Sequence, residues 1–262
     1  MATDDSPFAL AACAELLWQD KPIEWRAARL TEMNFGVGLW NWPTYDLASL
    51  EAVGADYTIM NGYVEGRLAD DDGADMLLAS AQETAQVGKR LGVSRLNLHG
   101  TGLGFDGIPK LKQFVVSGAM WIKAVDTLHR LCDMAERENV VFTLENLNLM
   151  EHPGCPFNST ADVLSLVSAV DRPQLRMNLD LYHTQIGEGD LVRWCEKCLP
   201  WVGEIQVADN PGRCEPGSGE INYKHIARRL YELDYRGPLA MEGLASGDAD
   251  AALLAFREAF TL

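Results

Sequence analysis

The sequence predicts an α/β protein that folds as one closed (β/α)₈ barrel, the TIM-barrel architecture. Eight short apolar runs alternate along the chain with longer stretches that have helical periodicity. Such alternation indicates βαβ units and a parallel sheet. The chain has 262 residues. Each unit therefore averages about 33 residues, which suits a barrel of roughly 250 residues. No linker-like segment divides the chain, so we expect residues 1–262 to form a single domain.

The expected strands are runs of apolar and β-branched residues at 8–13, 35–39, 57–60, 95–98, 140–144, 175–179, 202–205 and 238–241. The expected helices lie between them, where apolar residues recur every three or four positions, at 23–33, 47–53, 74–91, 116–138, 160–170, 191–199, 223–233 and 249–260. A doubly wound open sheet is the alternative. It would usually carry a G-x-G-x-x-G loop after an early strand, and the glycine-rich segment 100–104 does not match that pattern.

The charge balance of the chain argues against two classes of partner. Lys and Arg number 22 and Asp and Glu number 38, so the formal net charge is −16. Such an acidic surface repels phosphate backbones and anionic lipid, so we expect neither a nucleic-acid nor a membrane partner. No apolar run approaches the roughly 18–20 residues that a membrane-spanning helix needs.

The cysteines of the chain indicate a reducing compartment. Six cysteines are scattered over a long chain, a pattern typical of reduced thiols in a cytoplasmic protein. Cys195 and Cys198 form a C-x-x-C pair inside an expected helix. Without a second pair this is a weak zinc signal, so we expect two buried thiols.

Four polar side chains follow four successive apolar runs: Glu145, Asp180, Gln206 and Glu242. They are spaced about one βα repeat apart, and the carboxyl ends of barrel strands converge on one mouth. Three carboxylates and an amide gathered there would need a cation, and hard oxygen ligands favour Mg²⁺ or Mn²⁺ over zinc. The alternative is that these residues are polar only because the chain enters solvent where a strand ends.

Three motifs resemble the hydroxypyruvate isomerases: Leu144-Glu145-Asn146, segment 178–185 (NLDLYHTQ) and segment 204–223 (EIQVADNPGRCEPGSGEINY). These enzymes are part of the xylose isomerase-like TIM barrels, a group that also includes ketose 3-epimerases and endonuclease IV. The third motif is the longest and most specific, and it is similar to the hydroxypyruvate isomerase and 2-oxo-tetronate isomerase branch. The resemblance extends over residues 140–245 and is weak before them.

The resemblance implies a metal-dependent isomerase with a defined site. Glu145, Asp180, Gln206 and Glu242 would be the metal ligands, and Glu145 and Glu242 would also be the catalytic acid/base pair. Interconversion of an α-hydroxy aldehyde and an α-hydroxy ketone moves a proton between adjacent carbons through an enediolate. A divalent cation stabilises the developing charge, and two carboxylates can remove and return the proton.

The resemblance also implies substrate contacts from His183 and Arg213. We place His183 on the loop after the strand that ends near Asp180, with a capping or supporting role as the alternative. Arg213 lies in a Pro/Gly-rich loop, where its guanidinium suits a substrate carboxylate. The alternative is an ion pair that fixes the loop, with Glu215 or Glu220 as partner.

Two further positions are candidate substrate contacts at the barrel mouth. His99 ends the fourth expected strand and is expected to face the mouth. Trp40, with Trp42 close by, is expected either to line the pocket or to pack in the core.

The sequence departs from the family after the last predicted ligand. The family often has a basic residue there, whereas this chain reads Glu242-Gly243-Leu244-Ala245, and Cys214 replaces a histidine that is usual in the long loop. The substrate is therefore open between a small hydroxy-carbonyl acid, of the hydroxypyruvate or tartronate semialdehyde type, and a sugar.

Four alternatives to hydroxypyruvate isomerase activity remain. A 2-oxo-tetronate isomerase or a ketose 3-epimerase would use the same site. A non-catalytic sugar-binding barrel would keep only the pocket. A phosphodiesterase like endonuclease IV would need more zinc-binding histidines and a basic face, and five histidines with a net charge of −16 disfavour it. A homo-oligomer is possible for each of these.

Overall fold

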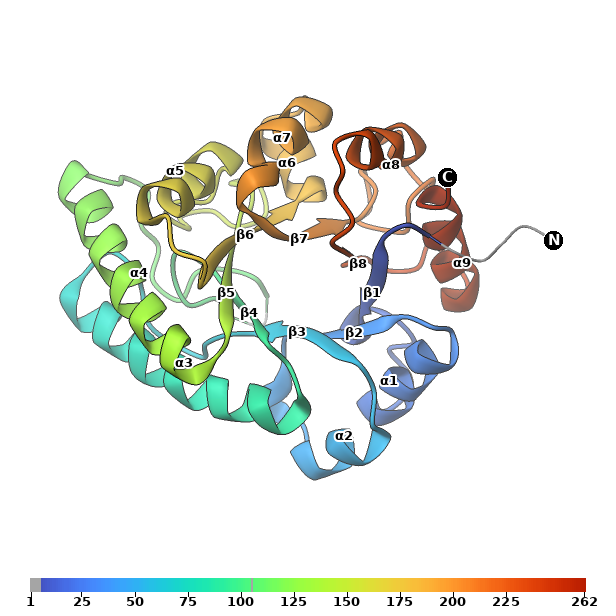
Figure 1. Cartoon of the computed structure of the whole chain (residues 1–262), viewed down its shortest axis with the longest axis horizontal. Coiled ribbons are helices and arrows are strands. Elements are labelled where there is room, and N and C mark those ends of the chain that lie inside the picture. Colours follow the sequence, from blue (N-terminus) through green and yellow to red (C-terminus); the bar gives the residue numbers. More distant parts are fainter. Residues whose placement is uncertain (1–5, 105) are drawn as a thin grey trace.

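A computed structural model describes residues 6–104 and 106–262 and confirms the closed barrel. In this part of the chain each strand pairs in parallel with the next, and the last strand closes the ring on the first (Figure 1). The strands are β1 (Ala9–Cys13), β2 (Gly36–Leu39), β3 (Tyr57–Asn61), β4 (Arg95–Leu98), β5 (Val141–Glu145), β6 (Leu175–Asp180), β7 (Val202–Val207) and β8 (Pro238–Met241).

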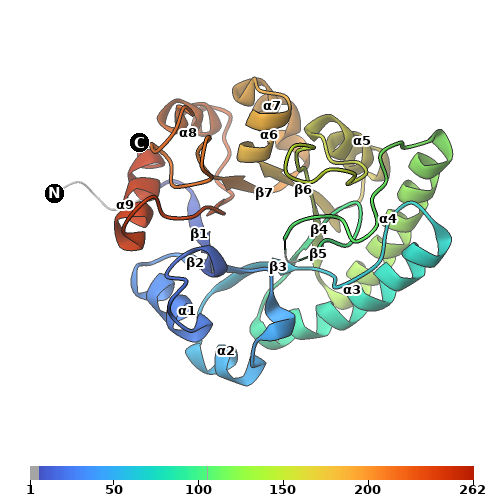
Figure 2. The same ribbon diagram turned by 180° about the vertical axis from the view of Figure 1, so that it is seen from behind.

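The helices form a layer outside the strands, as the two opposite views show (Figures 1 and 2). They are α1 (Ile23–Glu32), α2 (Leu47–Val53), α3 (Asp71–Leu91), α4 (Gly118–Glu138), α5 (Thr160–Val170), α6 (Leu181–Gly187), α7 (Leu191–Cys198), α8 (Tyr223–Glu232) and α9 (Ala249–Ala259), with short 3₁₀ helices η1 (Ala14–Leu16), η2 (Trp42–Thr44) and η3 (Leu199–Trp201). Helix α3 begins earlier than expected because Asp70 caps it by accepting a hydrogen bond from the backbone N–H of Gly73.

Helix α6 is the one α-helix in the described part of the chain that the sequence pattern did not predict. It follows β6 without a loop, because Asp180 is both the last residue of the strand and the cap of the helix, accepting from the backbone N–H of His183. The expectation that His183 lies on a loop is therefore wrong. A helix this short has too few turns for its apolar periodicity to show in the sequence.

The main core lies between the barrel and the helices. Alternate residues of the strands, such as Leu96 and Leu98 of β4, pack in this layer with helix residues such as Leu77 and Leu128. Burial of these side chains supplies the dominant favourable term for the fold, and alternation along a strand leaves the residues between them for the barrel interior.

The interior of the barrel contains polar contacts that cross from strand to strand. Nδ2 of Asn178 on β6 donates to Oδ1 of Asn97 on β4 at 3.1 Å. In addition, Nε of Arg95 on β4 lies 3.1 Å from Oε2 of Glu204 on β7. Glu204 is fully buried, and burial raises its pKa to about 7 although Arg95 opposes the shift. These contacts tie together strands that are not neighbours in the sheet.

All six cysteines are free, and Cys195 and Cys198 are buried on α7, as predicted. The cytoplasmic location that such thiols suggest stays a prediction. Over the described residues, no helix combines the length and the apolar character that crossing a membrane requires.

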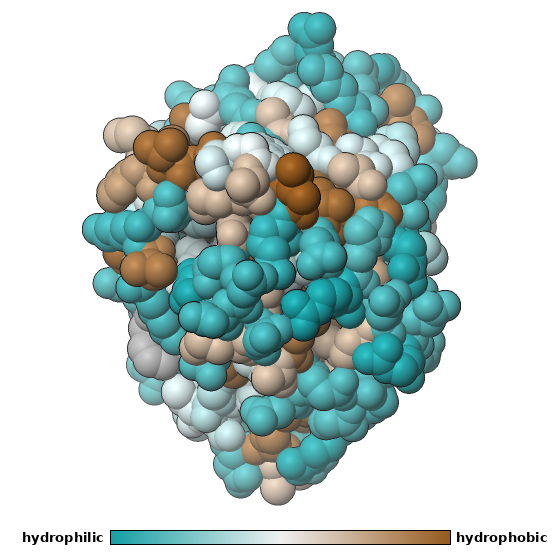
Figure 3. Space-filling model, turned by 90° about the vertical axis from the view of Figure 1, so that its left-hand side faces the viewer, coloured by the Kyte–Doolittle hydropathy of each residue, from teal (hydrophilic) through white to brown (hydrophobic). Residues whose placement is uncertain are grey.

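The side of the molecule that carries α3 and α4 is largely hydrophilic, with separate apolar patches (Figure 3). Exposed apolar side chains near the start of α4 include Phe114, Val115 and Ile122. Apolar side chains of this kind are a common basis for association. Homo-oligomerisation stays a prediction.

Candidate active site

The carboxyl ends of the strands open into a cavity of about 650 Å³. Seven of the eight expected site residues line it: Trp40, His99, Glu145, His183, Gln206, Arg213 and Glu242. Asp180, the eighth, is buried at the end of β6. The strand register explains the convergence, because Asp180 pairs with Gln206 across β6 and β7. The structure therefore brings residues that are far apart in sequence to one mouth, where barrel active sites are built.

Glu145 is held by side chains from both sides of β5. Its Oε2 atom accepts hydrogen bonds from Nδ2 of Asn97, from Nε2 of His99 at 3.1 Å and from Nδ2 of Asn178 at 3.4 Å. Burial alone would raise the pKa of Glu145, but the charge of His99 and its hydrogen bonds lower it below the usual value. Glu145 is thereby held as a carboxylate.

His99 is oriented by a tyrosine as well as by Glu145. The hydroxyl of Tyr63 donates to the backbone carbonyl of Thr101 at 2.6 Å, so its oxygen accepts from Nδ1 of His99 at 3.2 Å. Nδ1 of His99 therefore faces the hydroxyl oxygen of Tyr63, and Nε2 faces the carboxyl group of Glu145. Direct contact of His99 with substrate stays a prediction, and the structure shows it supporting Glu145.

Asp180 lies beside Glu145 and His183. One carboxylate oxygen of each acid and one ring nitrogen of His183 lie within 4.8 Å of one another. Burial, and then the charge of Glu145, raise the pKa of Asp180 to about 7. Two buried carboxylates at this separation repel each other, and a cation between them would remove the repulsion.

Gln206 on β7 pairs in register with Asp180 and lines the same cavity. Its Oε1 atom is buried and has no hydrogen-bond partner among the described residues. Buried acceptors without a partner are rare, and each calls for an explanation. Oxygen atoms from Glu145, Asp180 and Gln206 form a donor set that suits Mg²⁺ or Mn²⁺ better than zinc. These residues therefore fit a divalent cation.

Glu242 follows β8 and is paired with Arg213. Nη2 of Arg213 lies 2.8 Å from Oε2 of Glu242, and Nε donates to the Glu242 backbone carbonyl at 3.3 Å. Burial raises the pKa of Glu242 to about 8, against the opposing charge of Arg213. The groups of ligand atoms that lie within 4.8 Å of one another, searched over the described residues, do not include Glu242. Its role as a ligand stays a prediction.

The alternative interpretation of Arg213, an ion pair with Glu215 or Glu220 that fixes the loop, is wrong about the partner. Glu215 accepts hydrogen bonds from Ser246, and Glu220 accepts one from Asn210. These contacts fix the long loop after β7 without Arg213. The guanidinium is directed to the cavity instead, where it also lies 5.2 Å from the ring centroid of Tyr182.

The hydrogen bonds of Asn148 determine which nitrogen of His183 carries its proton. Oδ1 of Asn148 accepts from the backbone N–H of Glu151 at 2.9 Å, so Nδ2 is the group that faces Nδ1 of His183 at 2.7 Å. An amide nitrogen only donates, so Nδ1 of His183 accepts. Burial lowers the pKa of His183 well below its usual value, which keeps the ring neutral. Its proton is therefore on Nε2, and His183 is a hydrogen-bond donor at the site.

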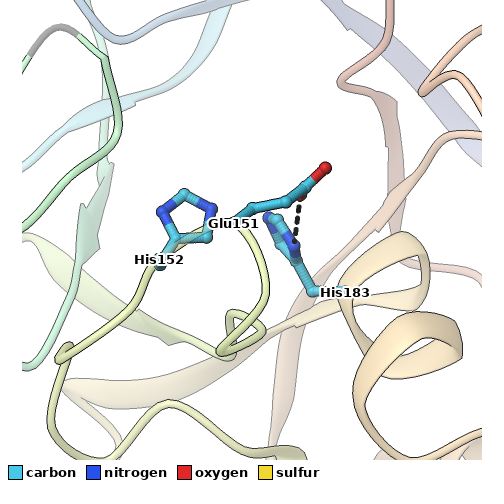
Figure 4. Close-up of side chains that lie close together, drawn as sticks. All are labelled: Glu151, His152 and His183. Atoms are coloured by element: carbon cyan, nitrogen blue, oxygen red, sulfur yellow. Dashed lines mark ion pairs between the residues drawn. The ribbon is translucent and has the colours of Figure 1, made fainter. Parts of the chain in front are cut away.

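A second cluster of possible ligands lies next to the first. Glu151, His152 and His183 each offer an atom within 4.8 Å of the others (Figure 4). The His183 nitrogen that lies 3.7 Å from Glu151 is Nδ1. That nitrogen already accepts from Asn148. A metal ion bound through that nitrogen would have to break its hydrogen bond with Asn148.

The two tryptophans after β2 have different positions. Trp40 is 37% exposed and lines the cavity. Trp42 packs against the core, and its Nε1 donates to the backbone carbonyl of Asn61 at 3.0 Å. Of the two expected environments, the pocket wall is therefore confirmed for Trp40 and core packing for Trp42.

Sequence reasoning missed His152 and Asn61. Both line the cavity, and each has a buried polar atom without a partner among the described residues, Nε2 of His152 and Oδ1 of Asn61. Asn61 ends β3 just as Glu145 ends β5, so the same strand-end signal could have found it. His152 lies in the loop after β5, where spacing carries no such signal.

The chain folds as a closed barrel with carboxylates and an amide side chain at the carboxyl ends of its strands. These two features define the class of (β/α)₈ barrel proteins that build their sites at that end of the barrel. Residues 38–259 match the family model described as xylose isomerase-like TIM barrel. The chain belongs to this family. The resemblance seen in the three sequence motifs is thereby confirmed.

Comparison with individual proteins gives the following similarities. The chain is 33% identical over 118 residues to hydroxypyruvate isomerase of Escherichia coli (strain K12), covering 45% of this chain and 46% of that protein. It is 26% identical over 262 residues to a putative hydroxypyruvate isomerase of Streptomyces coelicolor, covering 90% of each. The chain spans about half the length of the first curated relatives that it matches.

A solved structure supports the fold. The crystal structure of AP endonuclease, family 2, from Brucella melitensis superposes with a TM-score of 0.83 at 23% identity, covering 95% of this chain and 98% of that one. At this level of identity the likeness shows the fold alone.

Proposed function

We propose that the chain is a metal-dependent isomerase that interconverts the aldose and ketose forms of a small hydroxy-carbonyl acid or sugar, of the hydroxypyruvate and tartronate semialdehyde type. The observation that carries this proposal is the convergence of Glu145, Asp180 and Gln206 at the barrel mouth, with Oε1 of Gln206 buried and unpartnered among the described residues. The similarity to hydroxypyruvate isomerases supports it.

Glu145, Asp180, Gln206 and Glu242 are the residues that we propose to hold Mg²⁺ or Mn²⁺. A bound divalent cation would polarise the carbonyl and hydroxyl oxygens of the substrate and stabilise the charge that develops when the proton leaves carbon. The carboxylates and the amide oxygen supply hard donors of the kind these two ions prefer.

Glu145 and Glu242 are suited to opposite proton-transfer roles. The pKa of Glu145 is lowered, whereas that of Glu242 is raised to about 8. Pairs of titratable groups whose pKa values are pushed apart are typical of an acid and its base. We assign proton removal from carbon to Glu145 and proton return to Glu242.

His183 and Arg213 orient the substrate and the acid/base pair in this proposal. Nε2–H of His183, directed to the site by Asn148, donates to a substrate oxygen. Arg213 holds the carboxyl group of Glu242 in place at 2.8 Å. Trp40 forms part of the cavity wall and limits water access to the reacting carbons.

A 2-oxo-tetronate isomerase or a ketose 3-epimerase remains the second candidate, because it would use the same ligands and the same glutamates. The carbon that exchanges its proton separates these activities. An aldose–ketose isomerase exchanges protons at C1 and C2 of a sugar, or at the equivalent carbons of a hydroxy acid, whereas a 3-epimerase exchanges the proton at C3.

The test is proton NMR in D₂O on hydroxypyruvate, a 2-oxo-tetronate and simple ketoses. We expect deuterium to enter at C1 and C2 of a sugar, or at the equivalent carbons of a hydroxy acid, and not at C3 of a ketose. We expect this exchange to stop after exhaustive chelation and to resume when Mn²⁺ or Mg²⁺ is added. Exchange that survives chelation would contradict metal dependence. Binding of these compounds without any exchange would favour a sugar-binding barrel.

A further inference from the structure

Glu15 is a buried acid that the proposed chemistry does not use. It lies in η1, the short helix that follows β1, and only 8% of the residue is exposed. Its Oε1 atom accepts hydrogen bonds from two consecutive backbone N–H groups, those of Trp40 and Asn41, both at 2.9 Å. Its Oε2 atom accepts from the thiol of Cys13 at 3.3 Å. Both carboxyl oxygens are therefore engaged with the protein.

The two backbone bonds join the ends of neighbouring strands. β1 and β2 pair in parallel and lie side by side in the barrel (Figure 1). β2 ends at Leu39, so the N–H groups of Trp40 and Asn41 lie just beyond the strand and have Glu15 as their acceptor. The carboxyl group thus fixes the direction of the backbone where the chain leaves β2.

The backbone around Glu15 is itself anchored. Nη1 of Arg26 on α1 donates to the backbone carbonyl of Glu15 at 3.2 Å and to that of Ala14 at 3.5 Å. Ala14 and Leu17, on either side of Glu15, are buried in the core. Because η1 is held in this way, the carboxyl group of Glu15 is a fixed point for the chain after β2.

The chain that Glu15 holds is part of the cavity wall. The residues of this segment that line the cavity are Leu39, Trp40, Asn41 and Pro43. Trp42 packs against the core and donates through its Nε1, whereas Trp40 is 37% exposed and its Nε1 donates to no group in the described part of the chain. The position of the Trp40 ring therefore depends on its backbone, and that backbone is held by Glu15.

The charge of Glu15 is a weaker influence on the site. Burial, and then the charges of Glu145 and Asp180, raise the pKa of Glu242 more than the charge of Glu15 does. Burial also raises the pKa of Glu15 itself, and the two backbone N–H groups oppose that rise. A carboxyl oxygen accepts from these groups whether or not the acid is ionised. The hydrogen bonds are thus the feature of Glu15 that persists in both protonation states.

We infer that Glu15 is a positioning residue, which holds Trp40 at the substrate through hydrogen bonds to the backbone after β2. Trp40 in turn packs against the carbon skeleton of the substrate and keeps water from it. The inference rests on the proposed function for the identity of the substrate. Loss of the hydrogen bonds weakens substrate binding and leaves the proposed metal ligands, which lie at β5 to β8, in place.

The kinetic test compares Glu15→Gln with Glu15→Met, two replacements of similar length, on hydroxypyruvate. Glutamine keeps an oxygen that can accept from both N–H groups but has no charge, whereas methionine has no oxygen. We expect KM to rise ~10-fold in Glu15→Met with kcat within ~3-fold of the wild type, and Glu15→Gln to recover most of the affinity.

Two results of this comparison would overturn the inference. If Glu15→Gln is as impaired as Glu15→Met, the charge and not the hydrogen bonds is responsible. A fall in kcat with unchanged KM would place Glu15 in the chemical step. The control is Glu83→Ala on the exposed face of α3, which we expect to leave KM unchanged.

Trp40→Ala tests the same contact from its other end. If Glu15 acts through Trp40, Glu15→Met adds little to the loss that Trp40→Ala already causes, so the double variant loses less than the product of the two single losses. Fully multiplicative losses would mean that Glu15 acts through another group, which would overturn the inference. An unchanged KM in Trp40→Ala would overturn it as well, whether or not Glu15→Met folds.

A measurement without turnover keeps the inference separate from the proposed function. ¹⁹F NMR of protein labelled with 5-fluorotryptophan reports each of the seven tryptophans, and Trp40→Phe assigns the Trp40 signal. We expect Glu15→Met to shift or broaden that signal, to leave that of Trp121 on α4 unchanged, and Glu15→Gln to resemble the wild type. A wild type inactive on hydroxypyruvate with this response would refute the isomerase but retain the positioning role. An unchanged Trp40 signal in Glu15→Met would overturn the inference.

Discussion

Arg213 and Glu242 form an ion pair between the loop after β7 and the end of β8, with Nη2 of Arg213 2.8 Å from Oε2 of Glu242. The guanidinium expected to hold a substrate carboxylate is thus bound to the residue proposed to return the proton. Because Arg213 lowers the pKa of Glu242 against the effect of burial, the pair sets the pH range in which Glu242 can act as an acid.

Replacement of Arg213 should move the alkaline limb of the pH–rate profile. Arg213→Ala removes the charge that opposes the raised pKa of Glu242, so that pKa rises further and Glu242 stays protonated to higher pH. We expect the alkaline limb of kcat/KM to shift upward by about 1 pH unit or more. Arg213→Lys should shift it less, and the exposed Arg193→Ala should not shift it. If the alkaline limb stays where it is in Arg213→Ala, ionisation of Glu242 does not cause that limb.

Removal of either proposed proton-transfer group should slow the chemical step. Glu145→Gln and Glu242→Gln keep the shape of the side chains but cannot exchange a proton. We expect each to lower kcat by at least ~10²-fold, the usual scale for an acid or base. Glu258→Gln on the exposed face of α9 is the matched control. Near-normal solvent exchange in either variant would remove that residue from the role.

Gln206 should matter for metal affinity more than for folding. Gln206→Leu removes the unpartnered Oε1 atom and leaves a shorter apolar side chain, so a divalent cation would lose one oxygen ligand. We expect the Kd for Mn²⁺, measured by titration calorimetry, to rise ~10–100-fold. Gln206→Glu keeps an oxygen at this position and should bind Mn²⁺ at least as tightly as the wild type. Equal affinity in wild type and Gln206→Leu would exclude Gln206 as a ligand.

Asn148 should determine the tautomer of His183. In Asn148→Asp the amide donor becomes an oxygen, and an oxygen facing Nδ1 of His183 favours a proton there instead of an acceptor. We expect the ¹⁵N spectrum of His183 to report a protonated Nδ1, and kcat/KM to fall ~10–100-fold. If Asn148 has a purely structural role, Asn148→Asp will lower the stability of the protein, and the ¹⁵N chemical shifts of His183 will stay as they are in the wild type.

Glu204 should make the stability of the barrel depend on pH. Its pKa is about 7 in the folded chain against 4.5 for an unperturbed glutamate, so between these values the folded state holds a proton that the unfolded state has lost. The contribution of Glu204 to the free energy of unfolding is therefore fully present below pH 4.5 and is lost as pH rises through 7. The total loss is about 3 kcal/mol.

Urea unfolding in the presence of chelator at pH 5 and pH 8 measures that loss. The free energy of unfolding should fall less steeply with pH in Glu204→Gln, which has no ionisable group at this position. Asp180 and Glu242 also have raised pKa values, but they are present in both proteins. The difference between the two proteins in how steeply the free energy of unfolding falls with pH is therefore the effect of Glu204. Parallel pH profiles would contradict the raised pKa of Glu204.

The barrel and much of its mouth could be predicted because periodicity and strand ends are local signals. The run at 140–144 predicted β5, which the structure places at Val141–Glu145, so Glu145 was located from its neighbours in sequence. Helix α6 was missed because it is short and begins directly at Asp180. His152 was missed because its position in the cavity depends on a contact with Gly107, and no sequence pattern predicts a contact between two loops.

The sequence by itself determined the alternation of strands and helices, the family and the four oxygen-bearing residues at the strand ends, because these depend on residue type and spacing along the chain. Only the tertiary structure decided which partner each side chain has. The Arg213–Glu242 pair, the His99–Glu145 contact, the Asn148–His183 hydrogen bond and the His152–Gly107 contact join residues on different βα units. Hydrogen bonds and ion pairs act over a few ångströms, and only the closed barrel brings those atoms within that range.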